Sequence, residues 1–311
     1  MRIVPVFAVF VIMLFCAPVV QAQEYRDYSF SLCPQFGVFY GQIEEIVYPS
    51  DTKADLLSLL TWDLKPVFYF GLLMELSPAK PMERWGLFSG LSMKFGIPGP
   101  SGVMEDRDWM SKENTELTHF SSHDNVTKEI FLLDFSAGVS FPFFNALLVK
   151  TFVNLSYMNF RFSGENGYGF YPLKTPPEVS FSGKVINYRQ EWLYFAPGVS
   201  VGYAYKDFFL AEISFMASPL VLCFDLDEHI EKKLQFMDNM IGGIMLEPGL
   251  RCSLNLGKRL GIFCDISWRY ISGTRGPTYS KPIGYGNYTQ NGEAGAGMSM
   301  LNTSLSLKVK L

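Results

Sequence analysis

The chain is short of cysteine and has no excess of basic residues. Only 5 of its 311 residues are cysteine, and no two of them form a Cys-x-x-Cys pair. Neither a disulfide framework nor a redox motif is therefore predicted. Lysine and arginine number 26 against 30 aspartate and glutamate residues, which gives a net charge of −4. Because nucleic acids are bound mainly through lysine and arginine, this balance argues against a nucleic-acid partner.

Long apolar runs are also missing once the start of the chain is passed. An almost unbroken apolar run extends from Val4 to Phe15, and Val20-Gln21-Ala22 offers small residues at a cleavage position. Residues 1–22 therefore predict a secretory signal, and residues 23–311 a mature domain. Cys16 leaves a lipoprotein leader as an alternative, although the large residue before it fits that motif poorly. No later segment reaches the roughly 18 apolar residues that a membrane-spanning helix needs.

What the chain does contain is apolar and aromatic residues in alternation. Hydrophobic residues make up 48% of the sequence and aromatic residues 16%, which is a rich content for a secreted protein. From Leu301 to Leu311 apolar side chains take alternate positions, and Leu260 to Tyr270 shows the same pattern. In a transmembrane barrel the apolar face meets lipid, whereas in a soluble sandwich the polar face points outward. The secretory signal, the strand length and the aromatic strand ends favour the barrel.

The pattern predicts an all-β fold: a ten-stranded antiparallel transmembrane β-barrel with long extracellular loops and short periplasmic turns. An even strand number is what a single-chain bacterial barrel requires, and ten strands leave a lumen that side chains can fill, which disfavours a diffusion porin. The expected strands run over residues 26–47, 57–76, 83–97, 129–143, 147–163, 184–205, 208–229, 236–256, 259–273 and 297–311. The expected long loops are 48–56, 98–128, 164–183, 230–235 and 274–296.

A change of parity in one expected strand predicts a β-bulge. Apolar side chains occupy odd positions before Ala217-Ser218-Pro219 and even positions after it. One inserted residue within 216–220 explains the change, and proline is tolerated at bulges. The change turns Asp225, Asp227 and His229 towards the interior of the barrel.

Two short acidic clusters on the long-loop side carry the strongest chemical signal: Asp106-Arg107-Asp108-Trp109-Met110 and Asp225-Leu226-Asp227-Glu228-His229. Residues two apart on a strand share a face, so each cluster presents its acidic side chains together. A carboxylate pair opposite an Asp/His pair can activate a water molecule. Calcium binding or simple hydration is the alternative. Zinc is disfavoured because only one histidine belongs to a cluster, and no Gly-x-Ser-x-Gly motif supports serine hydrolysis.

The other histidines and two of the cysteines are expected to have no catalytic role. His119 and His123 fall in an expected polar loop and are predicted to be solvated. Cys252 and Cys264 lie symmetrically about an expected hairpin turn at 257–259 and should face each other across two strands. They are interpreted as lipid-facing thiols, with a disulfide between them as the alternative.

The two acidic motifs resemble those of the omptins, outer-membrane proteases of Gram-negative bacteria, and the resemblance spans nearly the whole mature chain. It implies a ten-stranded barrel with an extracellular groove, in which an Asp pair faces an Asp–His pair and water is the nucleophile. The residues that match these catalytic positions are Asp106, Asp108, Asp227 and His229.

The resemblance also implies a pocket for the basic side chain of a substrate, because omptins prefer to cleave between two basic residues. Glu45, in the motif Glu44-Glu45-Ile46-Val47-Tyr48, and Asp225 match its two acidic positions. Parity gives independent support, since the aromatic side chains at 36 and 40 take the face opposite to that of Glu45. Paired hydrogen bonds to an arginine of the substrate would follow.

Omptins need lipopolysaccharide, which binds to basic and aromatic residues on the outer wall. Tyr157 and Arg161 resemble part of that site, whereas Asn159 stands where the family often has an acid. The terminal Leu311 also departs from the aromatic residue that usually ends an outer-membrane barrel. The resemblance implies a requirement for lipopolysaccharide but no metal or other cofactor.

The sequence thus predicts a monomeric outer-membrane endopeptidase that cleaves peptides or host proteins at dibasic sites, without a covalent intermediate. Its active site is expected to face the cell exterior, with outer-membrane lipid around the barrel and no nucleic acid bound. The alternative is a non-catalytic barrel that acts as an adhesin or receptor, and the presence of all four catalytic positions argues against it.

Overall fold

The computed structural model describes residues 28–49, 56–111, 116–144, 146–172, 174–206 and 208–311. The predicted signal segment, residues 1–22, lies outside these ranges. In the described chain every regular element is a β-strand, and no helix there has the length and hydropathy needed to cross a membrane.

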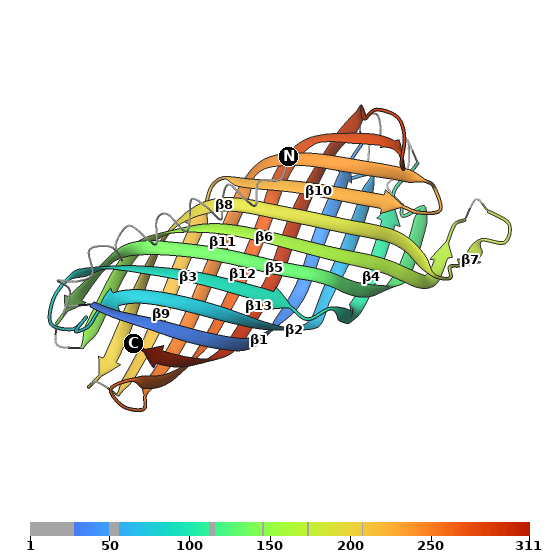
Figure 1. Cartoon of the computed structure of the whole chain (residues 1–311). Coiled ribbons are helices and arrows are strands. Elements are labelled where there is room, and N and C mark those ends of the chain that lie inside the picture. The colour runs from blue at the N-terminus through green and yellow to red at the C-terminus, as the bar shows by residue number, and fades with distance from the viewer. Residues whose placement is uncertain (1–27, 50–55, 112–115, 145, 173, 207) are drawn as a thin grey trace.

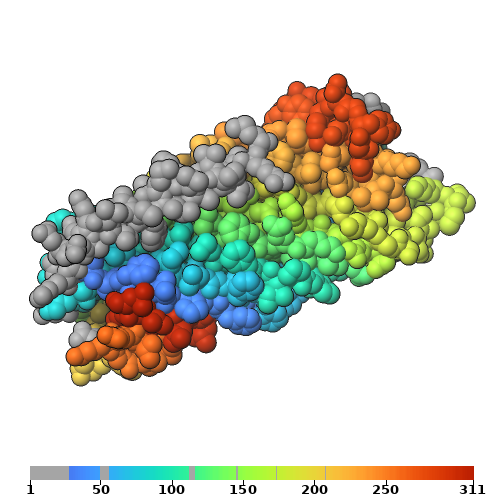
Figure 2. Space-filling view, viewed as in Figure 1, coloured from blue at the N-terminus to red at the C-terminus, as the bar shows by residue number. Residues whose placement is uncertain are grey.

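The strands form one closed antiparallel sheet, because β13 pairs back onto β1. Figure 1 shows an elongated barrel, with the short hairpin around β7 projecting at one end, and the space-filling view in Figure 2 has the same elongated outline. The strands are β1 (Tyr28–Tyr48), β2 (Ser58–Pro78), β3 (Gly86–Gly96), β4 (Gly99–Asp108), β5 (His119–Phe143), β6 (Leu147–Phe170), β7 (Glu178–Ser180), β8 (Lys184–Tyr205), β9 (Phe209–Ser218), β10 (Val221–His229), β11 (Leu234–Asn255), β12 (Leu260–Pro282) and β13 (Thr289–Lys310).

The ring contains ten passages of the chain, which confirms the predicted ten-stranded antiparallel barrel. Strands β3 and β4 follow each other along one wall, and both pair with β2 and β5. Strands β9 and β10 do the same between β8 and β11. Strand β7 pairs only with the end of β6 in the described chain and adds nothing to the ring.

The prediction of long loops is wrong for large parts of three segments, because the sheet continues through them. Most of 98–128 belongs to β4 and β5, and both ends of 274–296 belong to β12 and β13, while the start of 164–183 extends β6. These segments lack apolar alternation because their outward face lies beyond the lipid-facing belt, whereas backbone hydrogen bonding continues without regard to side chains. The strands therefore rise well above the belt on the long-loop side.

The predicted bulge is confirmed. In the pairing with β8, Met216 lies opposite Gly198 and Val221 opposite Tyr194, so five steps along one strand match four along the other. One residue is therefore inserted between β9 and β10, around Pro219. Outward exposure moves from odd positions such as Phe215 to even positions such as Leu222.

Exposed apolar side chains form a belt around the barrel, and on several strands this belt ends below the long-loop rim. On β1, β10 and β11 the last exposed large apolar side chains before this rim are Tyr40, Leu222 and Ile241. On a lipid-facing surface such a belt marks the membrane-spanning part of the strands. The strand segments beyond it, towards the long-loop rim, lie outside the membrane-spanning part, and the acidic clusters belong to them.

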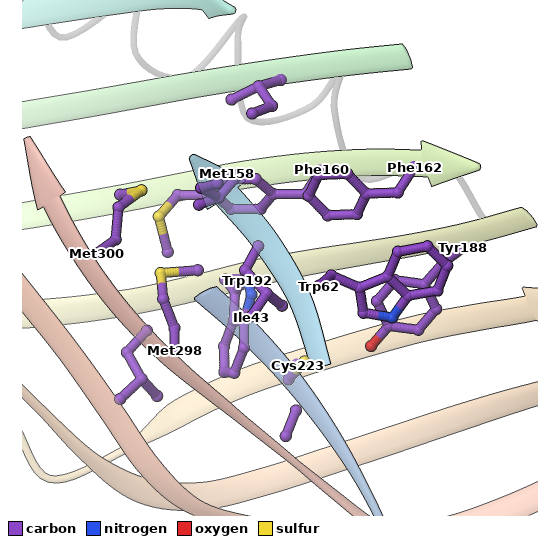
Figure 3. Packing of buried hydrophobic residues seen from close by; sticks show 14 of the residues in the cluster. Ile43, Trp62, Met158, Phe160, Phe162, Tyr188, Trp192, Cys223, Met298 and Met300 are labelled. Atoms are coloured by element: carbon purple, nitrogen blue, oxygen red, sulfur yellow. The ribbon is translucent and has the colours of Figure 1, made fainter. Parts of the chain in front are cut away.

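An apolar layer fills the lumen beneath the rim. Trp62 stacks on Tyr188 with ring centroids 4.9 Å apart and on Phe162 at 5.6 Å, and all three side chains are buried. Figure 3 shows these rings beside methionines from β6 and β13. Each aromatic pair adds about 0.5–1.5 kcal/mol beyond its buried area. This layer therefore gives rigid support to the strand ends at the rim.

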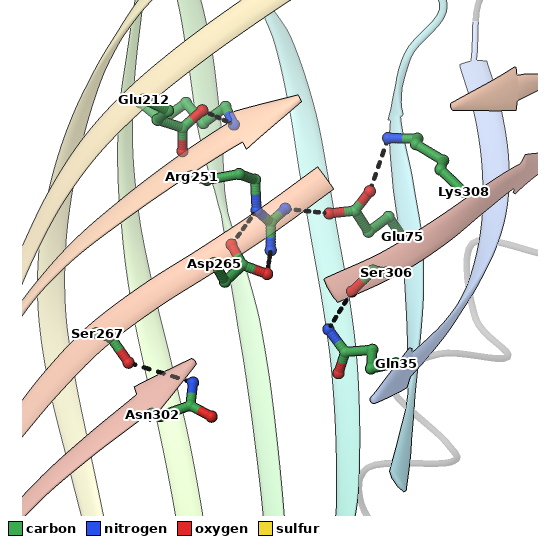
Figure 4. Close-up of polar contacts among 10 residues, drawn as sticks. Gln35, Glu75, Glu212, Arg251, Asp265, Ser267, Asn302, Ser306 and Lys308 are labelled. Carbon is green, nitrogen blue, oxygen red and sulfur yellow. Dashed lines mark hydrogen bonds and ion pairs between the residues drawn. The ribbon is translucent and has the colours of Figure 1, made fainter. Parts of the chain in front are cut away.

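Below the apolar layer the lumen is polar. A cavity of about 370 Å³ is lined by residues from most of the wall, and Figure 4 shows its ion pairs. Arg251 donates to Asp265 at 2.6 Å and to Glu75 at 2.7 Å, and Lys308 lies 2.7 Å from the second oxygen of Glu75. The predicted facing of Cys252 and Cys264 is confirmed on the outer side of this region, where they are partners in the β11–β12 ladder with free thiols.

Candidate active site

Asp106 and Asp108 lie together at the end of β4, on one face of the strand as their spacing predicts. The register places Asp106 between Leu60 of β2 and Ser121 of β5, and the hydroxyl of Ser58 donates to Asp106 at 3.1 Å. Burial and the neighbouring Asp108 raise the pKa of the Asp106 carboxyl to about 7. The pair therefore holds a proton near neutral pH that an isolated aspartate would have lost.

Asp227 and His229 form a hydrogen-bonded dyad at the end of β10. Nε2 of His229 lies 2.6 Å from Oδ2 of Asp227, and the aspartate is almost completely buried. Phe236 of β11 meets the imidazole edge-on, with ring centroids 5.4 Å apart. The aspartate and the aromatic ring hold the imidazole in one orientation, which a general base requires.

The dyad and the Asp pair act on each other electrostatically. Burial lowers the pKa of His229, but Asp227 and Asp106 raise it by more, so the pKa lies above its ordinary value. His229 in turn lowers the pKa of Asp106. In the ring, β4 and β10 stand on opposite walls, with β5, β6 and β8 between them on one side and five passages on the other. The barrel thus brings together two motifs that are far apart in the sequence.

Glu45 of β1 points into the lumen as predicted and meets Asp225 of β10. The structure adds a third carboxylate, Asp238 of β11, which lies directly opposite Asp225 in the ladder. One carboxylate oxygen of each residue lies within 4.8 Å of the others, a spacing that could also hold a metal ion. Burial is the main cause that raises the pKa of all three carboxyls, to about 6 for Asp238 and well above the ordinary value for Glu45 and Asp225.

A hydrogen-bonded bridge under this pocket was not predicted from the sequence. Gln190 of β8 donates to the hydroxyl of Tyr188 at 2.7 Å and to the backbone oxygen of Glu44, across the lumen, at 3.2 Å. Tyr188 donates to Asp225 at 3.2 Å, and Trp192 donates to Gln190 at 2.8 Å. Alternation places Gln190 inside the barrel with Tyr188 and Trp192 of the same strand, but no sequence signal shows its contact with Glu44 on the opposite wall.

The prediction of two solvated histidines is wrong for His123. This residue is 2% exposed, on β5, because the expected loop is strand and its alternation turns His123 inward. Its Nδ1 donates to the backbone oxygen of Asn166 at 2.5 Å, and its Nε2 accepts from Ser121 at 3.0 Å. Burial lowers the pKa of His123, so it serves as a neutral connector between β5 and β6. His119 is partly buried, beside Tyr171.

Tyr157 and Arg161 take positions of the same parity on β6, where Arg161 is exposed and Tyr157 is 6% exposed. Arg161 forms an ion pair with Glu129 at 3.2 Å, and the hydroxyl of Tyr157 donates to Glu191 at 3.0 Å. Asn159 lies between them and donates to Glu129 at 2.9 Å. The two residues thus belong to an outward polar cluster that contains acidic as well as basic groups.

Comparisons with known proteins agree with this architecture. The Omptin family model matches residues 26–311. The plasminogen activator of Yersinia pestis is 24% identical over 289 residues, which cover 89% of this chain and 88% of that protein. The crystal structure of the outer membrane protease OmpT from Escherichia coli superimposes with a TM-score of 0.80 at 17% identity, covering 93% of this chain and 99% of that chain.

Proposed function

The chain belongs to the omptin family, and from this premise we propose that it is an outer-membrane endopeptidase whose water nucleophile is activated between Asp106/Asp108 and Asp227/His229. One observation carries the proposal most directly: the buried Asp227–His229 contact of 2.6 Å stands in electrostatic reach of Asp106 on the opposite wall. No residue outside these four is needed to deliver and receive the protons of hydrolysis.

The geometry supports a division of labour between the two walls. Because Nε2–H of His229 donates to Asp227, Nδ1 is the ring nitrogen that takes the proton of the attacking water. Asp227 stabilises the imidazolium that results. The proton held by the pair of Asp106 and Asp108 near neutral pH is available for the leaving amine. Attack by water then needs no covalent intermediate.

Glu45 and Asp225 supply the specificity in this proposal. Both carboxylates are buried and lie next to the dyad, since Asp225 is two residues from Asp227 on the same face. A basic side chain of the substrate would neutralise them and place the following peptide bond near His229. Cleavage at dibasic sites in peptides and host proteins follows, and the similarity to a plasminogen activator supports a protein substrate.

The surroundings of the site are proposed from the same family. The rim with the four catalytic residues faces the cell exterior, and the barrel acts as a monomer. Lipopolysaccharide is required for activity and binds the outward face of β6 at Tyr157 and Arg161. Because Arg161 already pairs with Glu129, binding of the lipid phosphates would have to displace that carboxylate.

The test is cleavage of a fluorogenic Arg-Arg peptide by the folded barrel, with and without lipopolysaccharide. A double variant, Asp106→Ala with His229→Ala, serves as the inactive control. Cleavage by the wild type alone supports the protease, and a dependence on added lipid supports the lipid requirement. Absence of cleavage in both lipid conditions, and over a broad peptide library, would favour the non-catalytic adhesin or receptor instead.

A further inference from the structure

Asp238 is a buried acid that neither the water-activating groups nor the predicted pocket includes. It lies on β11, directly opposite Asp225 on β10, and is 1% exposed. Burial raises the pKa of its carboxyl, and interactions with Thr278 of β12 and with Asp225 lower it. Burying the charge of such an acid is costly unless the group is paired or keeps its proton, so a cationic partner would favour its ionised form.

The three carboxylates converge on a common point and leave acceptors unused there. Glu45 Oε2, Asp225 Oδ1 and Asp238 Oδ1 are buried and have no hydrogen-bond partner within the described chain. One carboxylate oxygen of each residue lies within 4.8 Å of the other two. Tyr188 donates to the second oxygen of Asp225, so that residue is held in place while its other oxygen stays available.

The described part of the chain offers this cluster no cation. Among the described residues no lysine or arginine forms an ion pair with Glu45, Asp225 or Asp238, although ion pairs are frequent in the lower lumen. These three carboxyls otherwise avoid a buried charge by keeping protons, since burial raises their pKa values, and a cationic ligand would supply the charge that lets them ionise. The cluster adjoins the dyad, because the ladder pair of Asp225 and Asp238 lies two positions from Asp227 on the same face of β10. A cation bound here lies beside the groups that attack the peptide bond.

We propose that Asp238 is a specificity-determining residue: with Glu45 and Asp225 it forms a three-carboxylate receptor for the basic side chain of the substrate. This inference rests on the proposed function and extends its pocket from two acids to three. A lysine ammonium has three N–H donors and an arginine guanidinium five, so either can serve all three acceptors. Three carboxylates around one cation bind it more tightly than two, because each contact is a charge-assisted hydrogen bond.

The kinetic test compares Asp238→Asn with wild type on matched peptides that carry arginine, lysine or neutral glutamine at the recognised position. We expect kcat/KM for the basic peptides to fall roughly ten- to one-hundred-fold, mostly through KM, with little change for the glutamine peptide. A loss confined to the arginine or to the lysine peptide also supports the receptor and identifies the preferred cation. Asp238→Glu, which keeps the charge, should recover part of the loss.

The matched control is Asp124→Asn, which removes an equal charge from an exposed carboxylate on β5 that bonds only to Asn166 among the described residues. It reports the long-range effect of charge on a cationic substrate. Equal effects of Asp238→Asn and Asp124→Asn, while Glu45→Gln and Asp225→Asn lose activity, would overturn the role of Asp238 and leave the proposed function intact.

A binding measurement separates the receptor from catalysis. Butylammonium and butylguanidinium are titrated calorimetrically into the folded His229→Ala barrel, with butanol as the neutral control and calcium as a competing cation. Binding of either amine that Asp238→Asn weakens supports the receptor, even if no peptide is cleaved and the proposed function fails. Binding of calcium alone would overturn the inference. Binding of butylammonium or butylguanidinium that Asp238→Asn leaves unchanged would also overturn it.

Discussion

The replacement Asp227→Asn should weaken the folded barrel in a way that depends on pH. Asp227 is 1% exposed and holds His229 through a single contact of 2.6 Å. Asparagine has nearly the same shape, so the substitution removes a charge and leaves the packing against Phe236 in place. The change in free energy of unfolding therefore reports the interaction between the carboxylate and the imidazole, less the repulsion that Asp227 exerts on Glu45 and Asp238.

The size and sign of the effect follow from the state of His229. Its pKa in the folded barrel lies above the ordinary value of 6.5, because Asp227 and Asp106 outweigh the effect of burial. The ion pair therefore stabilises the fold fully below pH 6.5 and is lost as the pH rises through the raised pKa. A hydrogen bond between charged groups contributes about 1.5–3 kcal/mol, and one without full charge about 0.5–1.5 kcal/mol.

Urea unfolding of wild type and Asp227→Asn in lipid vesicles, followed by tryptophan fluorescence, measures this difference. We expect about 1.5–3 kcal/mol near pH 5.5 and a smaller difference near pH 9. Asp124→Asn, at an exposed carboxylate, should show a small difference that is nearly constant with pH. A difference for Asp227→Asn that is constant or grows as the pH rises would refute the assignment of a charged pair.

Three further predictions concern other parts of the barrel. Because the pKa of Asp106 is raised to about 7, the folded barrel keeps this proton while the unfolded chain loses it, and stability falls as the pH rises from about 4 to 7. Asp106→Asn should therefore gain stability relative to wild type over that window in the same unfolding assay. Trp62→Ala should cost about 3–5 kcal/mol of unfolding free energy, because it removes a fully buried ring from the layer under the site. A lipid-soluble thiol reagent should label Cys252 and Cys264 in the folded barrel, whereas the two buried cysteines should react only after unfolding, as peptide mass spectrometry would show.

Alternation predicted which way the site residues point, because side chains on a strand have a strict period of two. The parity change around Pro219 located the bulge, and the bulge turns Asp225 and Asp227 into the lumen. Glu45 followed from the aromatic residues that share its strand. These predictions succeeded where one face of the strand meets lipid and the other does not.

The sequence gives no signal for strand or orientation where the contrast between a lipid-facing face and an inward face ends. Above the lipid belt both faces of β4, β5 and β12 carry polar residues, so the sequence predicts loops in place of these strand extensions and a solvated His123 in place of a buried one. Asp238 shares its parity with the buried Met240 and was predictable as an inward residue. Its proximity to Glu45 was not, because it depends on how the sheet closes and not on any local pattern.

The most direct test of the account is a double-mutant cycle with Asp106→Asn and His229→Ala, measured as kcat on the Arg-Arg peptide. Groups on opposite walls that act on one water form a single unit, and the losses from such groups are strongly non-additive. We expect each single variant to lose activity by about 10²–10⁴-fold and the double variant to lose little more than the worse of the two. Losses that multiply, or a single variant that keeps the wild-type rate, would contradict the shared water at the centre of the mechanism.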